Sequence, residues 1–172
     1  VYRAEDTKLG RDVALKFISP RGIEGPEERA RFLHEARAAA SLGHPNICTI
    51  YEIDEAEGRL FMAMELVEGE SLRSKIARGP LPMDEALDLA LQMAQGLEAA
   101  HGKGVVHRDV KPANVMVDPS GLVKIMDFGL AKLSGRTMLT KAGTTLGTVA
   151  YMSTEQARGK EADRRSDIWS LG

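Results

Sequence analysis

The residues best suited to chemistry lie in one short stretch, residues 107–114, which read His-Arg-Asp-Val-Lys-Pro-Ala-Asn. This stretch holds the carboxylate of Asp109, the ammonium group of Lys111 and the amide of Asn114. A second carboxylate, Asp127, follows 18 positions after Asp109. Two acidic groups and an amide beside a lysine suit a phosphate-bearing ligand held through a divalent metal ion. The stretch therefore predicts phosphate chemistry.

The residues between Asn114 and Asp127 predict a β-hairpin. Residues 113–117 and 122–126 form two short, mainly apolar runs, and the four residues between them read Asp-Pro-Ser-Gly. Two such runs around a turn sequence are typical of paired antiparallel strands. The hairpin would bring Asn114 and Asp127 back beside Asp109.

Taken together, these motifs resemble protein kinases. Residues 107–114 are similar to the kinase catalytic loop H-R-D-x-K-x-x-N, and residues 127–129 read D-F-G. Upstream, residues 13–16 read Val-Ala-Leu-Lys and resemble the kinase V-A-I-K. A D-F-G alone is weak evidence, since a solvated acidic turn before an ordinary strand would also contain it. Several kinase motifs in the expected order are much more specific evidence for the resemblance.

The resemblance implies a role for each matched residue. Asp109 would accept or orient the proton of the attacking hydroxyl, and Lys111 would steady the γ-phosphate of ATP. Lys16 would contact the α- and β-phosphates. Asn114 and Asp127 would hold Mg²⁺. A lysine two positions after the aspartate also favours serine and threonine over tyrosine as substrates.

The N-terminal third predicts a small sheet and one helix. Residues 1–6 and 11–18 would form a two-stranded ribbon, and residues 47–53 and 59–66 two further strands. A helix would run from Pro26 to about Leu42, because proline suits its first position and the apolar residues keep a helical period. By resemblance, Glu35 on this helix is the ion-pair partner of Lys16.

The resemblance also predicts where the nucleotide lies. Residues 64–69, Met-Glu-Leu-Val-Glu-Gly, resemble the kinase hinge, whose backbone groups meet adenine. Met64 would be the gatekeeper residue. Val1 matches only the last position of the glycine-rich G-x-G-x-x-G-x-V loop. Nucleotide contacts are expected from Val1, Ala14, Lys16, Met64, Glu65, Val67, Met116, Asn114 and Asp127.

The remaining chain predicts a mainly helical second lobe. Ser71 would cap a short helix, a longer helix would run from Asp84 to about Lys103, and the chain stops inside an apparent helix start. The expected fold is α+β and bilobal, truncated at both ends. The N-lobe would comprise residues 1–66, without the glycine-rich loop, and the C-lobe residues 67–172, ending at the start of the αF helix.

Residues 131–142 are polar and contain glycine, as in a kinase activation loop. Thr140 or Thr144 is the expected autophosphorylation site, and Arg108 could pair with a phosphate there. Thr148 resembles the threonine that lies near the catalytic aspartate and selects hydroxyl substrates. Thr154 departs from the family's A/S-P-E, so this segment is expected to be less rigid. Asp167 resembles the aspartate that braces the catalytic loop from below.

Composition limits the partners and the cellular location that can be expected for this chain. The 172 residues carry 23 basic and 25 acidic side chains, a net charge of −2, which favours neither nucleic acid nor an anionic membrane. The chain has one cysteine, Cys48, so an internal disulfide is excluded. We expect its thiol to be buried in a strand. No apolar run reaches membrane-spanning length, so a cytoplasmic location is expected.

The sequence is thus identified as resembling the bacterial, eukaryotic-like serine/threonine protein kinases. Such a protein would transfer the γ-phosphoryl group of ATP to protein hydroxyls with Mg²⁺. The alternative is a catalytically inactive fragment, or a pseudokinase that binds nucleotide or acts as a scaffold. A P-loop NTPase is excluded because no G-x-x-x-x-G-K-[ST] occurs.

Overall fold

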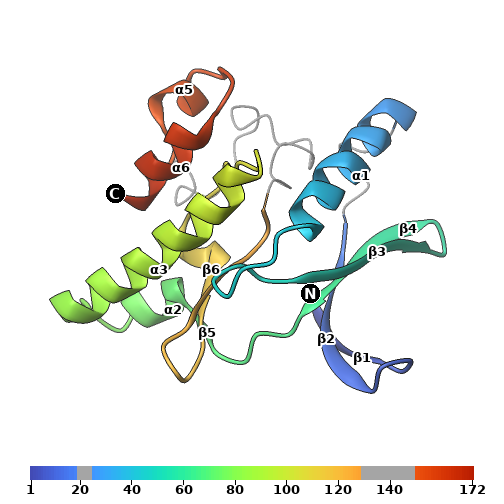
Figure 1. Ribbon diagram of the computed structural model, residues 1–172, viewed down its shortest axis with the longest axis horizontal. Helices are drawn as coiled ribbons and strands as arrows, with labels where there is room; N and C mark the ends of the chain where they lie inside the picture. The colour runs from blue at the N-terminus through green and yellow to red at the C-terminus, as the bar shows by residue number, and fades with distance from the viewer. Residues whose placement is uncertain (19–24, 129–149) are drawn as a thin grey trace.

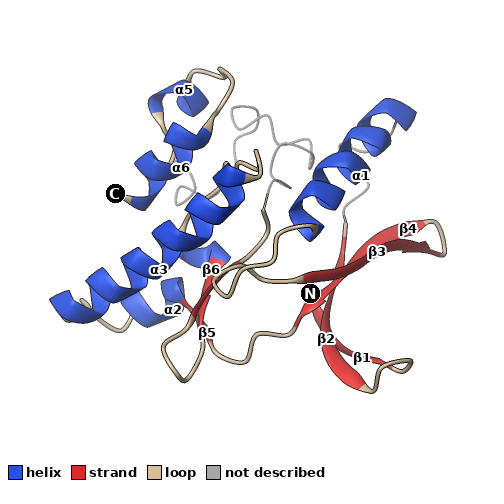
Figure 2. Cartoon of the chain, in the orientation of Figure 1, coloured by secondary structure: helices blue, strands red, loops and turns tan. Residues whose placement is uncertain are grey.

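The computed structural model describes residues 1–18, 25–128 and 150–172. Its elements fall into two parts (Figure 1). One part holds the larger sheet with helix α1 beside it, and the other holds helices α2, α3, α5 and α6 with a small sheet (Figures 1 and 2).

The larger sheet has four antiparallel strands in the order β1-β2-β4-β3. Its strands are β1 (Tyr2–Asp6), β2 (Arg11–Phe17), β3 (Ile50–Ala56) and β4 (Arg59–Glu65). The predicted strands are confirmed except that β3 is shifted: it begins at Ile50 and ends at Ala56, each three residues later than predicted. The residues before it make other bonds: Ile47 forms a parallel bridge with Ile125, and the N–H of Cys48 donates to the carbonyl of Ile125. Cys48 is buried as expected, but it lies outside a strand.

Helix α1 (Pro26–Ala40) covers one side of this sheet (Figure 1). Proline lies in its first turn with Glu27 and Glu28, where a fixed φ and negative charge both favour a helix start. Its buried residues, Phe32, Ala36 and Ala39, repeat at helical spacing as predicted. Phe32 and Ala36 share one core cluster with residues of β2 and β4, namely Ala14, Met62 and Met64, and with Cys48.

The second part is built around a hairpin. Strands β6 (Val115–Val117) and β7 (Val123–Ile125) pair antiparallel as predicted, and β5 (Glu70–Ser71) adds a third strand on the β6 side. A 3₁₀ turn, η1 (Pro112–Asn114), leads into β6. The helices are α2 (Leu72–Ile76), α3 (Met83–Gly102), α5 (Thr154–Ala157) and α6 (Arg164–Leu171).

Helix α3 supplies much of the second core. Leu89, Met93, Leu97 and Ala100 are buried and cluster with Val115, Val123 and Ile125 of the hairpin. Asn46, in the segment between α1 and β3, is also buried and donates to the Gln92 side chain at 3.1 Å and to the Val123 carbonyl at 3.0 Å. The two parts are therefore joined by buried polar contacts on α3 and β7.

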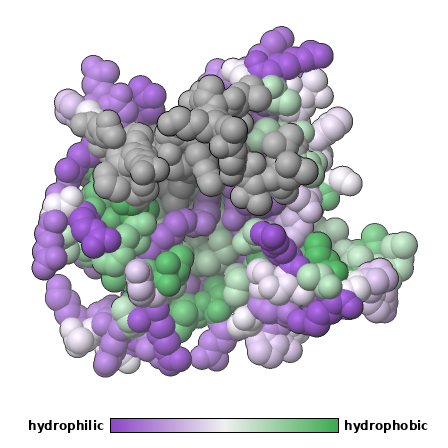
Figure 3. All heavy atoms as spheres, turned by 180° about the vertical axis from the view of Figure 1, so that it is seen from behind, coloured by the Kyte–Doolittle hydropathy of each residue, from purple (hydrophilic) through white to green (hydrophobic). Residues whose placement is uncertain are grey.

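The surface is mixed in character. Seen from behind, apolar atoms gather across the middle of the visible face and toward its right edge, and polar atoms lie along the left and lower edges (Figure 3). Met83, Leu87 and Leu91, spaced four residues apart on α3, are exposed by 74%, 63% and 58%. Among the described residues, no helix is both long enough and apolar enough to span a bilayer.

Gly69, between β4 and β5, allows a close backbone contact that we expect to matter for stability. A Cβ at this position would lie 2.2 Å from the carbonyl oxygen of Val117. Because the Val117 oxygen belongs to the main chain and a Cβ is rigidly attached to the backbone of residue 69, Gly69→Ala must displace one of the two segments. We expect a loss of about 1–3 kcal/mol in the free energy of unfolding. Urea denaturation measures this change.

Gly43→Ala is the matched control, since an added Cβ there meets nothing within 4 Å. Equal stability of the two variants would contradict the packing assigned to Gly69.

Candidate active site

The hairpin places the predicted chemical groups side by side. The N–H of Met126, just after β7, donates to the Asn114 carbonyl at 2.8 Å, and the N–H of Asn114 donates to the Lys111 carbonyl at 2.9 Å. These backbone bonds hold Asn114 next to the residue that precedes Asp127. The predicted return of Asn114 toward Asp109 is confirmed, since its amide donates to Asp109.

The Asp109 carboxylate is held by two side chains. Lys111 Nζ donates to its Oδ2 atom at 2.6 Å. Asn114 Nδ2 donates to the same Oδ2 atom at 3.0 Å and to the Asp109 carbonyl at 2.8 Å. The Lys111 and Asp109 side chains remain only 14% and 18% exposed. An anionic oxygen is thus fixed in a partly buried setting, beside a cation that would offset negative charge near it.

Lys16 and Asp127 form an ion pair across the two parts of the molecule. Lys16 Nζ, on β2, lies 2.6 Å from Asp127 Oδ1. Asp127 adopts a left-handed backbone conformation with φ of 62°, as does Arg108 with φ of 67°. This conformation is sterically unfavourable for residues other than glycine. They adopt it only where surrounding contacts hold them in it, and such residues are most frequent at functional sites.

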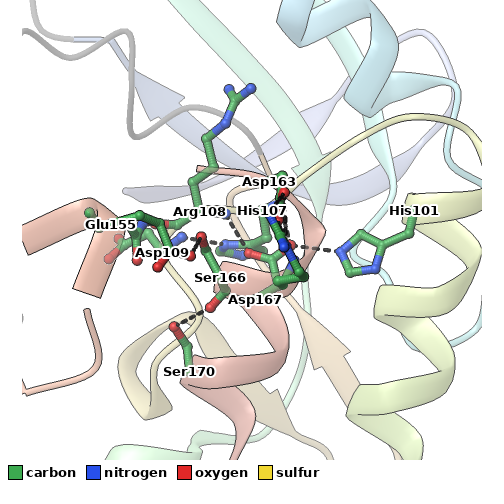
Figure 4. A network of polar contacts seen from close by, with 11 residues as sticks. His101, His107, Arg108, Asp109, Glu155, Asp163, Ser166, Asp167 and Ser170 are labelled. Carbon is green, nitrogen blue, oxygen red and sulfur yellow. Dashed lines mark hydrogen bonds and ion pairs between the residues drawn. The ribbon is translucent and has the colours of Figure 1, made fainter. Parts of the chain in front are cut away.

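The predicted ion pair between Lys16 and Glu35 is wrong for this structure. Glu35 Oε2 instead lies 3.3 Å from Arg108 Nη1, while Lys16 pairs with Asp127. The cause is the placement of α1. Its Glu35 faces the Arg108 side chain, which points away from Asp167 and out of the catalytic loop (Figure 4). Sequence similarity identified the correct charged residues but not how they pair.

Asp167, on α6, anchors the catalytic loop. Its carboxylate is fully buried and accepts from the N–H of His107 at 2.8 Å and from the N–H of Arg108 at 2.7 Å. It also accepts from Nε2 of His101, at the end of α3, at 2.8 Å (Figure 4). The expectation that Asp167 braces this loop is confirmed.

His107 is a packing residue with a buried ring. Its ring lies 4.7 Å from the Phe128 ring, centroid to centroid, in an edge-on arrangement. Nε2 donates to the Met126 carbonyl at 2.8 Å, and Nδ1 accepts from the N–H of Asp109 at 3.1 Å. One donor and one acceptor fit a neutral imidazole, and complete burial lowers the pKa of His107 below its usual value of 6.5.

Comparison with known proteins agrees with this geometry. The family model of the protein kinase domain, which describes the family's sequences, matches residues 1–172. The chain belongs to the protein kinase family.

The kinase relatives are bacterial serine/threonine-protein kinases. The chain is 43% identical over 178 residues to PknA of Mycobacterium tuberculosis, and all of it aligns with 41% of that protein. It is also 43% identical over 173 residues to PrkC of Bacillus subtilis, covering 100% of the chain and 27% of the relative. It therefore spans less than half the length of these curated relatives.

A solved kinase structure confirms the expected α+β, two-lobed fold. The crystal structure of the Mycobacterium tuberculosis PknI kinase domain matches with a TM-score of 0.79 at 31% identity. The match covers 99% of this chain and 64% of that one.

The residues expected to contact nucleotide in this kinase lie in several settings. Ala14 and Met64 pair across β2 and β4, are 6% and 3% exposed, and share one core cluster, against which Val67 packs. Met116 is half-buried in the middle of β6. Val1, by contrast, is 80% exposed.

Glu65 reaches the site only through its backbone. Its side chain accepts from Lys124 Nζ on β7, 2.8 Å from Oε1, and from the N–H of Thr49 at 3.2 Å. Its own N–H donates to the Thr49 carbonyl. The Glu65 side chain therefore holds the strand end, and its carbonyl accepts from the Cys48 thiol, 3.7 Å from Sγ.

The donor set near Asp127 fits Mg²⁺, which protein kinases generally use together with ATP. The Asn114 amide nitrogen donates to Asp109, so Oδ1 is the Asn114 atom suited to a cation. With a carboxylate oxygen of Asp127, this makes two hard oxygen ligands, and Mg²⁺ typically completes its shell with phosphate oxygens and water. Within the described residues, no group of three or more His, Cys, Asp or Glu is arranged to hold a metal by itself.

Three expected positions, Thr140, Thr144 and Thr148, lie outside the described residues.

Helix α5 begins at Thr154, where the family pattern has a proline, and its start is stabilised in another way. Ser153 accepts from the N–H of Gln156, and the Gln156 side chain returns a bond to the N–H of Ser153, which makes a capping box at the start of α5.

The sequence did not identify three residues that hold the site through hydrogen bonds or ion pairs: Lys124, His101 and Gln156. Lys124 and His101 act across long sequence separations, which no local pattern reports. Gln156 did carry a signal, since the Ser-x-x-Gln spacing from Ser153 is that of a capping box.

The buried neutral ring of His107 makes stability depend on pH. The unfolded chain takes up a proton on this side chain as pH falls below about 6.5, whereas the folded chain, with its lowered His107 pKa, takes it up only at lower pH. The unfolded state then binds more protons, so the free energy of unfolding should fall with falling pH. For one such group the slope is at most about 1.4 kcal/mol per pH unit.

Urea denaturation at pH 7.5, 6.5 and 5.5 tests this, with His107→Gln as the comparison variant. The slope below pH 6.5 should be smaller in the variant. A ring that shows a protonated imidazolium at pH 6 by ¹⁵N NMR of the wild type would contradict the assignment.

Proposed function

We propose that this chain carries the catalytic residues of a serine/threonine protein kinase, which transfers the γ-phosphoryl group of ATP to a protein hydroxyl. The observation that supports this most is the Asp109 carboxylate, held by Lys111 and Asn114 beside the Lys16–Asp127 pair. The chain covers 41% of PknA and 27% of PrkC, so the activity of the whole protein is itself part of the proposal.

In this proposal, Asp109 accepts or orients the proton of the attacking serine or threonine hydroxyl. Its Oδ2 atom is already occupied by Lys111 and Asn114, so the carboxylate has one defined orientation before a substrate arrives. Lys111, only 2.6 Å away, would offset the negative charge of the transferring phosphoryl group. ATP bound with Mg²⁺ supplies the phosphoryl group, and Asn114 and Asp127 would hold the metal.

Lys16 would position the α- and β-phosphates, and Glu35 would position Lys16. For Glu35 to do so, both residues must exchange partners, because Glu35 is bound to Arg108 and Lys16 to Asp127. The four side chains are between 22% and 30% exposed. Partly exposed ion pairs of this kind are worth about 1 kcal/mol or less, so the exchange is energetically accessible.

The adenine would lie against the Ala14–Met64 pair and the residues that follow β4. The carbonyl of Glu65 and the backbone of Val67 would meet its polar edge, and Val1 and Met116 would cover it from two sides. We place the boundary between the two lobes in this segment, with residues 1–66 as the N-lobe and residues 67–172 as the C-lobe. Proposed autophosphorylation sites are Thr140 and Thr144, and Thr148 would lie near Asp109 and the substrate hydroxyl.

The proposal predicts that two substitutions abolish transfer for different reasons. Asp109→Asn removes the proton acceptor while keeping size and shape, and Lys16→Met removes the phosphate contact. In the natural full-length protein, we expect each to reduce transfer from radiolabelled ATP and Mg²⁺ by roughly 10²- to 10⁴-fold.

Asp84→Asn and Lys8→Met are the matched controls, since both positions are exposed and lie away from the site. Label should appear on serine or threonine in the wild type and in both controls. ATP binding without any transfer in the wild type would reject the kinase proposal in favour of a pseudokinase.

A further inference from the structure

The side chain of Gln156 forms hydrogen bonds with two separate segments, the start of α5 and the loop that contains Asp109. Its Oε1 atom accepts from the N–H of Ser153 at 3.1 Å and completes the capping box of α5. Its Nε2 atom donates to the carbonyl of Arg108 at 2.7 Å, across 48 positions of sequence. One amide therefore connects α5 to the residue directly before Asp109.

The bond from Gln156 reaches the carbonyl of a residue with an unfavourable backbone conformation. Arg108 lies in the left-handed region with φ of 67°, which costs of order 1 kcal/mol or more for a side chain of this kind. Its N–H is held by Asp167 Oδ1 at 2.7 Å, and its carbonyl is held by Gln156. Both polar groups of this strained residue are thus bound by side chains from later helices.

The same bond fixes the orientation of Asp109. The peptide group that joins Arg108 to Asp109 is planar, so its oxygen and its N–H move together. The oxygen accepts from Gln156, and the N–H of Asp109 donates to His107 Nδ1 at 3.1 Å. With both ends of this plane bound, the N and Cα atoms from which the Asp109 side chain extends are fixed in place, and Lys111 and Asn114 hold its carboxylate.

We propose that Gln156 is a positioning residue for Asp109, acting through the carbonyl of Arg108. The proposal builds on the kinase function above, because a positioned carboxylate affects transfer only if Asp109 takes part in it. A misplacement of about 1 Å at a reacting group can reduce a rate by about 100-fold. Loss of the Gln156 bond should therefore act on kcat and leave the nucleotide contacts on the other lobe unchanged.

The competing interpretation is that Gln156 only caps α5. Two substitutions separate these roles. Gln156→Glu keeps an oxygen for the N–H of Ser153, since Ser-x-x-Glu is itself a capping box, but it has no hydrogen to give to Arg108. Gln156→Lys keeps a donor that can reach a carbonyl but has no acceptor for Ser153.

Positioning and capping predict opposite orders of activity. If Gln156 positions Asp109, Gln156→Glu should lower kcat by about tenfold or more with KM for ATP within about twofold of the wild type, and Gln156→Lys should retain more activity than Gln156→Glu. If Gln156 only caps α5, Gln156→Glu should retain wild-type kcat, which would overturn the proposal. Gln156→Ala should match Gln156→Glu in kcat, which checks that the added negative charge is not the cause.

A second measurement does not require kinase activity. The amide of Asp109 is shielded in the wild type by its bond to His107, and release of the Arg108 carbonyl should let this peptide rotate. We expect hydrogen exchange at the Asp109 amide to accelerate by about tenfold in Gln156→Glu. Unchanged exchange would overturn the positioning role. Accelerated exchange in a protein that transfers no phosphate would keep it and reject only the kinase function.

Discussion

The buried carboxylate of Asp167 is the contact on which the catalytic loop depends. It is fully buried and accepts three hydrogen bonds, from the backbone N–H groups of His107 and Arg108 and from the ring of His101. Charge-assisted bonds of this kind are the stronger ones in proteins, and a buried carboxylate without them would strongly destabilise the fold. The loop is therefore held from α6 and from the end of α3, elements that pack against each other.

From Asp167, a short series of hydrogen bonds leads to Asp109. His107, held by its N–H, binds the Met126 carbonyl with one ring nitrogen and the Asp109 N–H with the other, and its ring packs on Phe128. Arg108 is bound at its N–H, its carbonyl and its guanidinium group by three different elements. In contrast, the pairs of Lys16 with Asp127 and of Glu35 with Arg108 are partly exposed, and the proposed function requires them to exchange partners. Residues 107–109 are thus held by buried contacts, whereas these ion pairs lie partly in solvent.

The sequence predicted best what is local. The hairpin around residues 118–121, the ribbon around Gly10 and helices α1 and α3 follow from turn residues and periodicity over short windows. Contacts that depend on how distant elements pack were not accessible in this way. Glu35 was assigned to Lys16 because family similarity names residues, whereas the position of α1 decides which cation its carboxylate reaches. Gln156 was overlooked because a local capping signal says nothing of a second partner 48 positions away.

The most direct test of the anchor is hydrogen exchange at the backbone amides of His107 and Arg108, followed residue by residue by NMR in the unmodified protein. Both lie in a loop, so without Asp167 they would exchange quickly. Bound to a buried carboxylate, they should exchange as slowly as core amides of β6 and β7, on the scale set by global unfolding. Exchange at the rate of exposed turn residues would contradict the account, because the loop would then not be held from α6.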